Sequence, residues 1–207
     1  MINFEQQDYK NHWENVYETK NQDEVSWTQK IPQTSLDLIE EASKGKSSTI
    51  IDVGGGDSNL VDFLLEKGFE NISVLDISAK ALEKAKTRLG TQAEKVNWIT
   101  TNITEFKPNT TYDIWHDRAA FHFLTTEEEI KKYAEIVKNA VSDTLIIGTF
   151  SVNGPQKCSG LSIVKYDEDH LKEIFSQSFE LVKSFTEDHI TPFNTVQNFI
   201  FCQFKKK

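Results

Sequence analysis

Short apolar runs of strand length alternate with segments of helical periodicity along most of this chain. The apolar runs cover residues 49–53, 72–76, 96–100, 112–116 and 144–150. The helical patterns between and after them cover residues 60–65, 79–89, 126–141 and 167–177. Regular alternation predicts a mostly parallel sheet with helices on both faces, because parallel neighbours need a crossover connection. We therefore predict the α/β class with a doubly wound sheet.

The two ends of the chain depart from this alternation. Residues 179–187 and 195–204 both have strand character with no helical pattern between them, which predicts an antiparallel C-terminal hairpin. Near the other end, Tyr9, Trp13 and Tyr17 are spaced i, i+4, i+8 and form one stripe of a helix. A second helical pattern follows, so the chain is expected to begin with a helical segment.

The size and composition of the chain limit its class. Its 207 residues suffice for one domain with a sizeable core. We expect a single domain over 1–207, with a helical cap at 1–48 and the core at 49–207. The net charge is −9, and an acidic surface repels phosphate backbones, so we expect no nucleic-acid partner. Cys158 and Cys202 form no C-x-x-C pair, so we expect neither a disulfide scaffold nor a metal site.

The sequence also bears on location. No apolar stretch approaches the roughly 18 residues that a membrane span requires. The first residues lack the apolar run of a secretory signal. We therefore expect a cytoplasmic protein with no membrane partner, and both a monomer and a homodimer remain open.

A turn of three glycines follows the first predicted strand and is flanked by Asp52 and Asp57. Dinucleotide folds use the pattern G-x-G-x-x-G, and here Asn59 stands where the third glycine belongs. Carboxylates are poor neighbours for a pyrophosphate, whereas S-adenosylmethionine (SAM) carries a cationic sulfonium and an ammonium. Glycines let the backbone approach such a ligand closely, and the carboxylates offset its charge. The turn therefore favours SAM over a dinucleotide.

Asp76 supplies a second acidic feature at the end of the second predicted strand. It lies twenty residues after Gly56. At this spacing a carboxylate accepts hydrogen bonds from the hydroxyls of a ribose. Because SAM and dinucleotides both contain ribose, Asp76 supports a nucleoside ligand without separating the two.

Four ordered segments resemble the class I SAM-dependent methyltransferases. They are IIDVGGGDSNL (50–60), VLDIS (74–78), WITTNITEF (98–106) and YDIWHDRAAFHFLT (112–125). The resemblance implies a Rossmann-like sheet of seven strands whose last pair is antiparallel. It also implies SAM contacts at Asp52, Gly54, Gly55, Gly56, Asp76, Ile77, Asn102, Ile103 and His116.

Within this set, the resemblance gives each part of the cofactor its own contacts. Gly54 and Gly56 would line the methionine part, Asp76 would hold the ribose, and Ile77 would pack on the adenine. The family often has Asp where Asn102 stands. An asparagine side chain can still accept a hydrogen bond from the exocyclic amine through its oxygen.

The chain is also similar to a narrower group of small bacterial methyltransferases labelled type 12. The matching signatures are HWENVY to EVSW (12–27), WHDRAAFHFLT (115–125), GPQKCSGL (154–161) and TPF (191–193). In that group the N-terminal aromatic residues cover the cofactor, which implies this role for Trp13 and Trp27.

The densest polar cluster, His116, Asp117 and Arg118, directly follows the fourth predicted strand, with His122 a few residues beyond. Arg118 and His122 would share a face if 119–124 turned helically. We take these four residues as catalytic candidates, with His122 as the general base because its intrinsic pKa is near neutral. Arg118 suits an anionic group on the substrate. Structural roles remain open: a backbone contact for His116, an Asp117–Arg118 ion pair, and a core position for His122.

The leading hypothesis is a SAM-dependent methyltransferase that acts on a small molecule by in-line displacement. Three alternatives stay open: a protein-lysine methyltransferase, a nicotinamide-dependent oxidoreductase on a similar sheet, and a SAM-binding module without turnover. Cys158 lies in a Gly/Pro-containing loop and is a minor candidate for substrate contact, although a buried apolar role is more common for a thiol.

Overall fold

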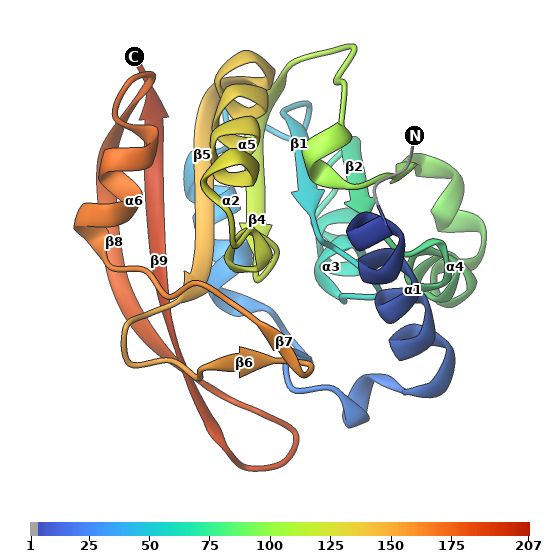
Figure 1. Cartoon of the computed structure of the whole chain (residues 1–207). Coiled ribbons are helices and arrows are strands. Elements are labelled where there is room, and N and C mark those ends of the chain that lie inside the picture. Colours follow the sequence, from blue (N-terminus) through green and yellow to red (C-terminus); the bar gives the residue numbers. More distant parts are fainter. Residues whose placement is uncertain (1–3) are drawn as a thin grey trace.

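The computed structural model describes residues 4–207, with side chains from Asp8 onward. Seven strands form one sheet in the order β3-β2-β1-β4-β5-β9-β8 (Figure 1). Their bounds are β1 Thr49–Val53, β2 Asn71–Asp76, β3 Val96–Thr100, β4 Tyr112–Arg118, β5 Val141–Phe150, β8 Phe179–Ile190 and β9 Val196–Lys206. Strands β1 to β5 are parallel, and β9 runs antiparallel to both of its neighbours. The predicted fold class and terminal hairpin are confirmed.

Helices cover both faces of the sheet (Figure 1). One face carries α2 Gln33–Ala42, α3 Leu60–Glu66 and α4 Ala79–Leu89, and the other carries α5 Glu127–Ala140 and α6 Glu168–Phe175. Ile50 and Ile51 are both fully buried but belong to opposite layers, since side chains alternate along a strand. Each such burial contributes about 1.5–3 kcal/mol, which explains why these strands read as continuous apolar runs.

The strand order reverses between β1 and β4. The chain moves outward from β1 to β3, then returns to β4 and proceeds in the other direction. Val53 and Asp117 are register partners at the carboxyl ends of these two strands. Loops that leave adjacent strands in opposite directions open a crevice, which is where α/β sheets bind ligands.

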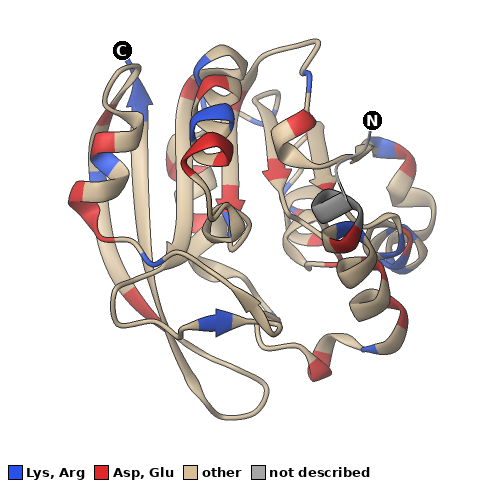
Figure 2. Ribbon diagram, in the orientation of Figure 1, with Lys and Arg blue, Asp and Glu red and all other residues tan. Residues whose placement is uncertain are grey.

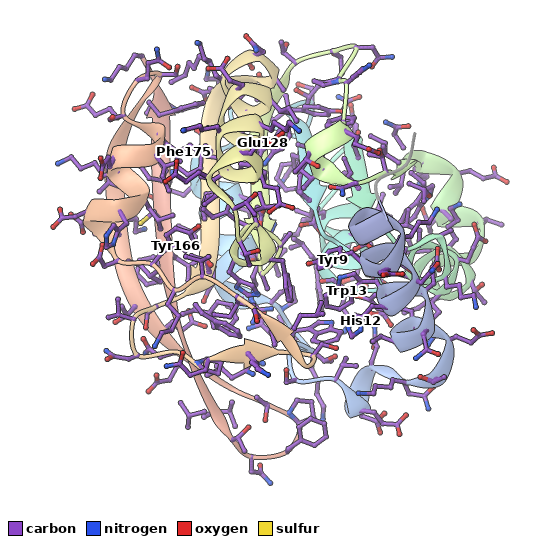
Figure 3. The ribbon with its side chains drawn as sticks, viewed as in Figure 1. Tyr9, His12, Trp13, Glu128, Tyr166 and Phe175 are labelled. Atoms are coloured by element: carbon purple, nitrogen blue, oxygen red, sulfur yellow. The ribbon has the colours of Figure 1, made fainter. Side chains whose placement is uncertain are left out.

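Helix α1 (Phe4–Thr19) extends from the cap region and packs against α4. The Glu14 carboxylate accepts hydrogen bonds from Ser78 Oγ (2.9 Å), Ala79 N (3.0 Å) and Lys80 N (3.1 Å). A carboxylate at a helix N-terminus is favourable because the free N–H groups point toward it. Figure 3 shows Tyr9 and Trp13 on the side of α1 that faces the rest of the molecule. Glu14 therefore holds α1 over the carboxyl end of the sheet.

Local details depart from the sequence patterns. Val141 begins β5 rather than ending α5, because a buried Val fits either periodicity. A small hairpin of β6 (Lys157–Cys158) and β7 (Leu161–Ser162) was not predicted. Short 3-10 turns occur at Gln22–Glu24, Gly90–Lys95, Ile103–Glu105 and Phe121–Phe123.

Basic and acidic residues are interspersed along the helices, as on α5 (Figure 2). Among the described residues, no helix is long and apolar enough to cross a membrane.

Candidate active site at the carboxyl ends of the strands

A cavity of about 670 Å³ lies at the carboxyl ends of β1, β2 and β4, beneath α1. It brings together most of the residues predicted from the sequence to contact the cofactor. Its wall contains Trp13, Trp27, Asp52, Gly54, Gly55, Asp76, Ile77, Asn102, Ile103, His116 and Arg118. Three predicted residues, Gly56, Asp117 and His122, do not line it.

The glycine turn forms the floor of the cavity and has no room for side chains. Gly54 has φ +68° and Gly56 has φ +52°, which L residues rarely adopt. A Cβ atom on Gly54 would lie 2.5 Å from the Cβ of Ala120. A Cβ atom on Gly56 would lie 2.5 Å from the Tyr17 hydroxyl, so Gly56 is covered by α1 rather than exposed to the cavity.

Asp76 presents a buried carboxylate beside this turn. Its Oδ1 accepts a hydrogen bond from Ser78 N (2.8 Å), and the Gly56 N–H also donates to the carboxylate. Burial raises the pKa of Asp76 to about 7, and the nearby charges of Asp52 and Asp57 add to this rise. A buried carboxylate that faces a cavity is stabilised by further donors, which a ribose diol supplies.

Ile77, Asn102 and Ile103, which we expect to contact the adenine, all line the cavity. Asn102 Oδ1 accepts hydrogen bonds from Thr104 N and Thr104 Oγ1, both at 3.0 Å. We expected this oxygen to be free for an exocyclic amine. It is instead engaged within its own turn, where it caps the Ile103–Glu105 3-10 helix.

Aromatic side chains of α1 and the segments beside it form another part of the cavity wall. Trp13 lies with its ring centroid 5.6 Å from that of Trp27 and 5.1 Å from that of Phe123, both edge to face. Tyr9, labelled in Figure 3, and Tyr17 extend this cluster along α1. Aromatic faces attract cations, so this wall and the carboxylates that line the same cavity suit a positively charged ligand.

His116 is held between two buried side chains. Its Nδ1 lies 2.7 Å from Asp52 Oδ1, and its Nε2 lies 2.9 Å from Ser35 Oγ. All three residues line the cavity. Sequence analysis missed Ser35, because nothing in its local pattern distinguishes it from a polar residue in the first turn of α2.

Arg118 shares the His116 face of β4. Its Nη1 donates to the Trp27 carbonyl (3.0 Å), and its guanidinium stacks 4.7 Å from the centre of the Phe199 ring. The Nε atom is buried without a hydrogen-bond partner among the described side chains. The ion pair between Asp117 and Arg118 that was considered from the sequence is not formed.

Asp117 points to the opposite face of β4, as strand alternation requires. Its Oδ1 accepts from Ala120 N and Phe121 N, both at 3.0 Å, and its Oδ2 accepts from Tyr133 Oη at 2.8 Å. Burial raises the pKa of Asp117 to about 6. Asp117, a predicted catalytic residue, therefore lies outside the cavity. Its carboxylate instead positions the turn that follows β4.

The geometry does not favour His122 as a general base. Its side chain is fully buried, stacks on Phe150 at 4.4 Å, and has no hydrogen-bond partner on either ring nitrogen among the described residues. Burial and the charge of Arg118 lower its pKa to about 3. The expected helical face shared with Arg118 is replaced by a 3-10 turn that directs His122 into the core.

Cys158 of β6 is buried at the edge of the cavity. Burial raises the pKa of its thiol to about 12, so it stays protonated. The β6–β7 turn contacts α1, since Ser159 Oγ lies 3.3 Å from His12 Nε2. Tyr17 and the β6–β7 turn also belong to the site, although neither was among the residues predicted to contact the cofactor. The signal for Tyr17 was its place in the aromatic stripe of α1.

Taken together, the residues fit SAM. Gly54 and Gly55 present backbone to the cavity, and a Cβ on either would collide with Ala120 or with Val74 and Asp52. Asp76 presents a buried carboxylate for a diol, and aromatic and acidic side chains line the same cavity.

Comparison with known proteins supports this fit. Residues 51–144 match the model of a family described as "Methyltransferase domain", of type 12. A SAM-dependent methyltransferase from Anabaena variabilis has a similar fold, with a TM-score of 0.75 and 13% identity over 100% of this chain and 96% of that one. The N-methyltransferase NodS from Bradyrhizobium japonicum, solved with S-adenosylhomocysteine (SAH), gives a TM-score of 0.70 and 13% identity over 93% and 97%.

Among curated proteins, the eEF1A lysine and N-terminal methyltransferase of Mus musculus is 23% identical over 121 residues. The match covers 57% of this chain but only 17% of that protein. Sequence and fold together thus define a class I SAM-dependent methyltransferase, as predicted, with SAM as the cofactor of the class. The family match covers residues 51–144, the part of the chain that runs from within β1 through α5 and holds the glycine turn.

Proposed function

We propose that this protein transfers a methyl group from SAM to a small-molecule acceptor in the cavity beneath α1. The observation that carries the proposal is the continuity of that cavity. It extends from Asp76 and the glycine turn to Arg118 and Cys158 within about 670 Å³. Cavities of about 300–1,000 Å³ hold ligands of drug size, so little room is left for an acceptor beyond a compact one.

The residues around the cavity divide the work of binding. Asp76 accepts hydrogen bonds from the ribose, and the glycine turn allows close backbone approach. When bound, SAM supplies a methyl group on a sulfonium, open to in-line displacement. The aromatic wall of Trp13 and Trp27 excludes water from the acceptor.

Ser35, His116 and Asp52 form a path for a proton if the acceptor arrives protonated. The acceptor gives its proton to Ser35 Oγ while the Ser35 hydroxyl proton moves to His116 Nε2. Asp52 then stabilises the imidazolium through Nδ1. General-base assistance of this kind is worth about 10²–10⁴-fold in rate.

Calorimetry with SAM and SAH tests whether the protein binds this cofactor. If neither binds, the proposal is wrong. Methyl-labelled SAM added to a cell extract tests the acceptor class. Label in the small-molecule fraction supports the proposal.

A protein-lysine methyltransferase is the second candidate. It is favoured by the similarity to the mouse protein, which is named as an eEF1A lysine and N-terminal methyltransferase. Label that precipitates with protein in the same extract would replace the small-molecule proposal with this one.

A further inference from the structure

Arg118 is a cation that forms no ion pair with any carboxylate among the described side chains. The chain's two arginines differ in this respect. Arg88 pairs with Asp62, with 2.7 Å between Nη2 and Oδ2. Arg118 forms no ion pair with the described side chains, and its partners are a backbone carbonyl and an aromatic ring.

The surroundings make this lack of a counterion costly. Arg118 is half-buried, and its Nε atom is fully buried with no hydrogen-bond partner among the described residues; a buried donor without a partner is unfavourable. Burial lowers the pKa of Arg118 to about 10, so the side chain still carries its charge at neutral pH. The nearby Asp52 and Glu187 carboxylates partly oppose this lowering of the pKa, but neither forms an ion pair with Arg118. A guanidinium in this state is poised for an anion that enters the cavity.

The position of Arg118 assigns that anion to the acceptor. The nucleoside end of the site is formed by Asp76 and Asn102, which follow β2 and β3. Arg118 ends β4, on the other side of β1, and stacks on Phe199 of β9. Arg118 thus lies apart from the nucleoside end, beside His116 and the Trp27 carbonyl, where the methionine end of the cofactor and the acceptor would meet.

We propose that the methyl acceptor carries a carboxylate and that Arg118 binds it. This inference rests on the proposed methyltransferase function and specifies its substrate class. The planar guanidinium matches a carboxylate in a bidentate arrangement. Asp52 and Glu187 nearby disfavour a doubly charged phosphate. A lysine ammonium is disfavoured as well, because it would lie beside a like charge.

Carboxylate–amide pairs test the inference on the wild-type protein. The SAH-saturated full chain is titrated with acetate, benzoate and 3-phenylpropionate, and separately with acetamide, benzamide and 3-phenylpropionamide. We expect at least one carboxylate to bind at least tenfold more tightly than its amide. Binding of none of the three acids, or equal binding of each acid and its amide, would overturn the inference.

Two variants then assign the effect to the side chain. Arg118→Gln is expected to lose at least tenfold in carboxylate affinity, Arg118→Lys to retain part of it, and both to bind SAH as the wild type does. Lys183→Gln, on the exposed face of β8, is the control for net charge. Melting temperatures check that each variant folds. If Arg118→Gln does not fold, the comparison of acids with amides on the wild-type protein still tests the inference.

The same titrations separate this inference from the proposed function. If Arg118→Gln weakens SAH but leaves methylthioadenosine, which lacks the carboxylate, unaffected, the guanidinium binds the cofactor and the inference is wrong. If wild-type protein binds neither SAM nor SAH, the methyltransferase proposal itself fails.

Discussion

At the scale of single residues, the site depends on carboxylates whose environments differ. Asp76 is buried beside a cavity, whereas Asp117 is saturated with protein donors on the opposite side of the sheet. Burial raises the pKa of both, but only Asp76 faces the space where a ligand fits. The same residue type thus serves binding in one place and backbone positioning in the other.

The pH dependence of SAH binding should report on Asp76. Its folded-state pKa of about 7 lies above its ordinary value, so the ligand-free fold holds a proton that the unfolded chain loses. The contribution of Asp76 to stability therefore falls as pH rises from about 4 to 7 and then levels off. Ribose hydroxyls need the ionised form as acceptor. SAH affinity measured by calorimetry should rise about tenfold from pH 6 to pH 8.

Asp76→Asn provides the comparison for this measurement. The variant should bind SAH more weakly and with no rise between pH 6 and pH 8. A wild-type profile that is flat over this interval would show that Asp76 is already ionised or does not hold the ribose.

Ser35→Ala tests the proton path. Removal of the hydroxyl interrupts the chain to His116 Nε2, and we expect kcat to fall about 10²–10⁴-fold. SAH affinity should stay within a factor of two of the wild type, because Ser35 lies on the acceptor side. Ser47→Ala, at an exposed serine outside the cavity, is the matched control. A fall in SAH affinity equal to the fall in kcat would indicate a structural role for Ser35.

At the scale of elements, α5 is joined to β4 by a buried polar link. Tyr133 Oη donates to Asp117 Oδ2 (2.8 Å) and accepts from Trp115 Nε1 (3.0 Å). This link fixes the carboxyl end of β4, and with it the turn that carries Ala120 against Gly54. The position of the glycine turn that forms the cavity floor thus depends on a hydrogen-bonded contact outside the cavity.

Tyr133→Phe should lower the free energy of unfolding by about 2–4 kcal/mol, because it leaves a buried N–H and a buried carboxylate oxygen unpaired. Urea unfolding measures this change. Tyr166→Phe is the matched control in the same core (Figure 3), since the Tyr166 hydroxyl is buried without a described partner. It should leave stability unchanged or raise it. Equal losses in the two variants would contradict the role given to the Tyr133 link.

At the scale of the whole molecule, the cavity is enclosed by segments far apart in the chain. Helix α1 contributes Trp13, β4 contributes Arg118, and the β6–β7 hairpin contributes Cys158 (Figure 1). Each segment is held by contacts to the others, such as the hydrogen bond from Arg118 to the Trp27 carbonyl. A ligand in the cavity therefore stabilises the entire domain.

This coupling predicts a thermal shift. SAH at a hundred times its Kd adds about 2.7 kcal/mol to stability, which raises the Tm of a domain of this size by roughly 5–10 °C. NAD at the same concentration should leave the Tm unchanged. A shift with NAD and none with SAH would revive the oxidoreductase hypothesis.

The sequence alone predicted the features that depend on local pattern. The parallel core follows from alternating strands and helices, and the cavity floor follows from a glycine turn after β1. Asp76 was predicted at the cavity because its place at a strand end is visible in the sequence. The opposite orientation of Asp117 was predictable too, since neighbours in a strand face opposite sides.

Only the tertiary structure decided which polar side chains meet. Ser35 and His116 come from different elements, and their contact depends on how α2 packs on the sheet. His122 has a near-neutral intrinsic pKa, yet it lies in the core because the chain after β4 forms a 3-10 turn. Among the described residues, Arg118 has no ion-pair partner, because the packing of neighbouring segments places no carboxylate close enough to it. Periodicity and spacing are local properties of a chain, whereas burial and pairing arise from contacts between distant segments.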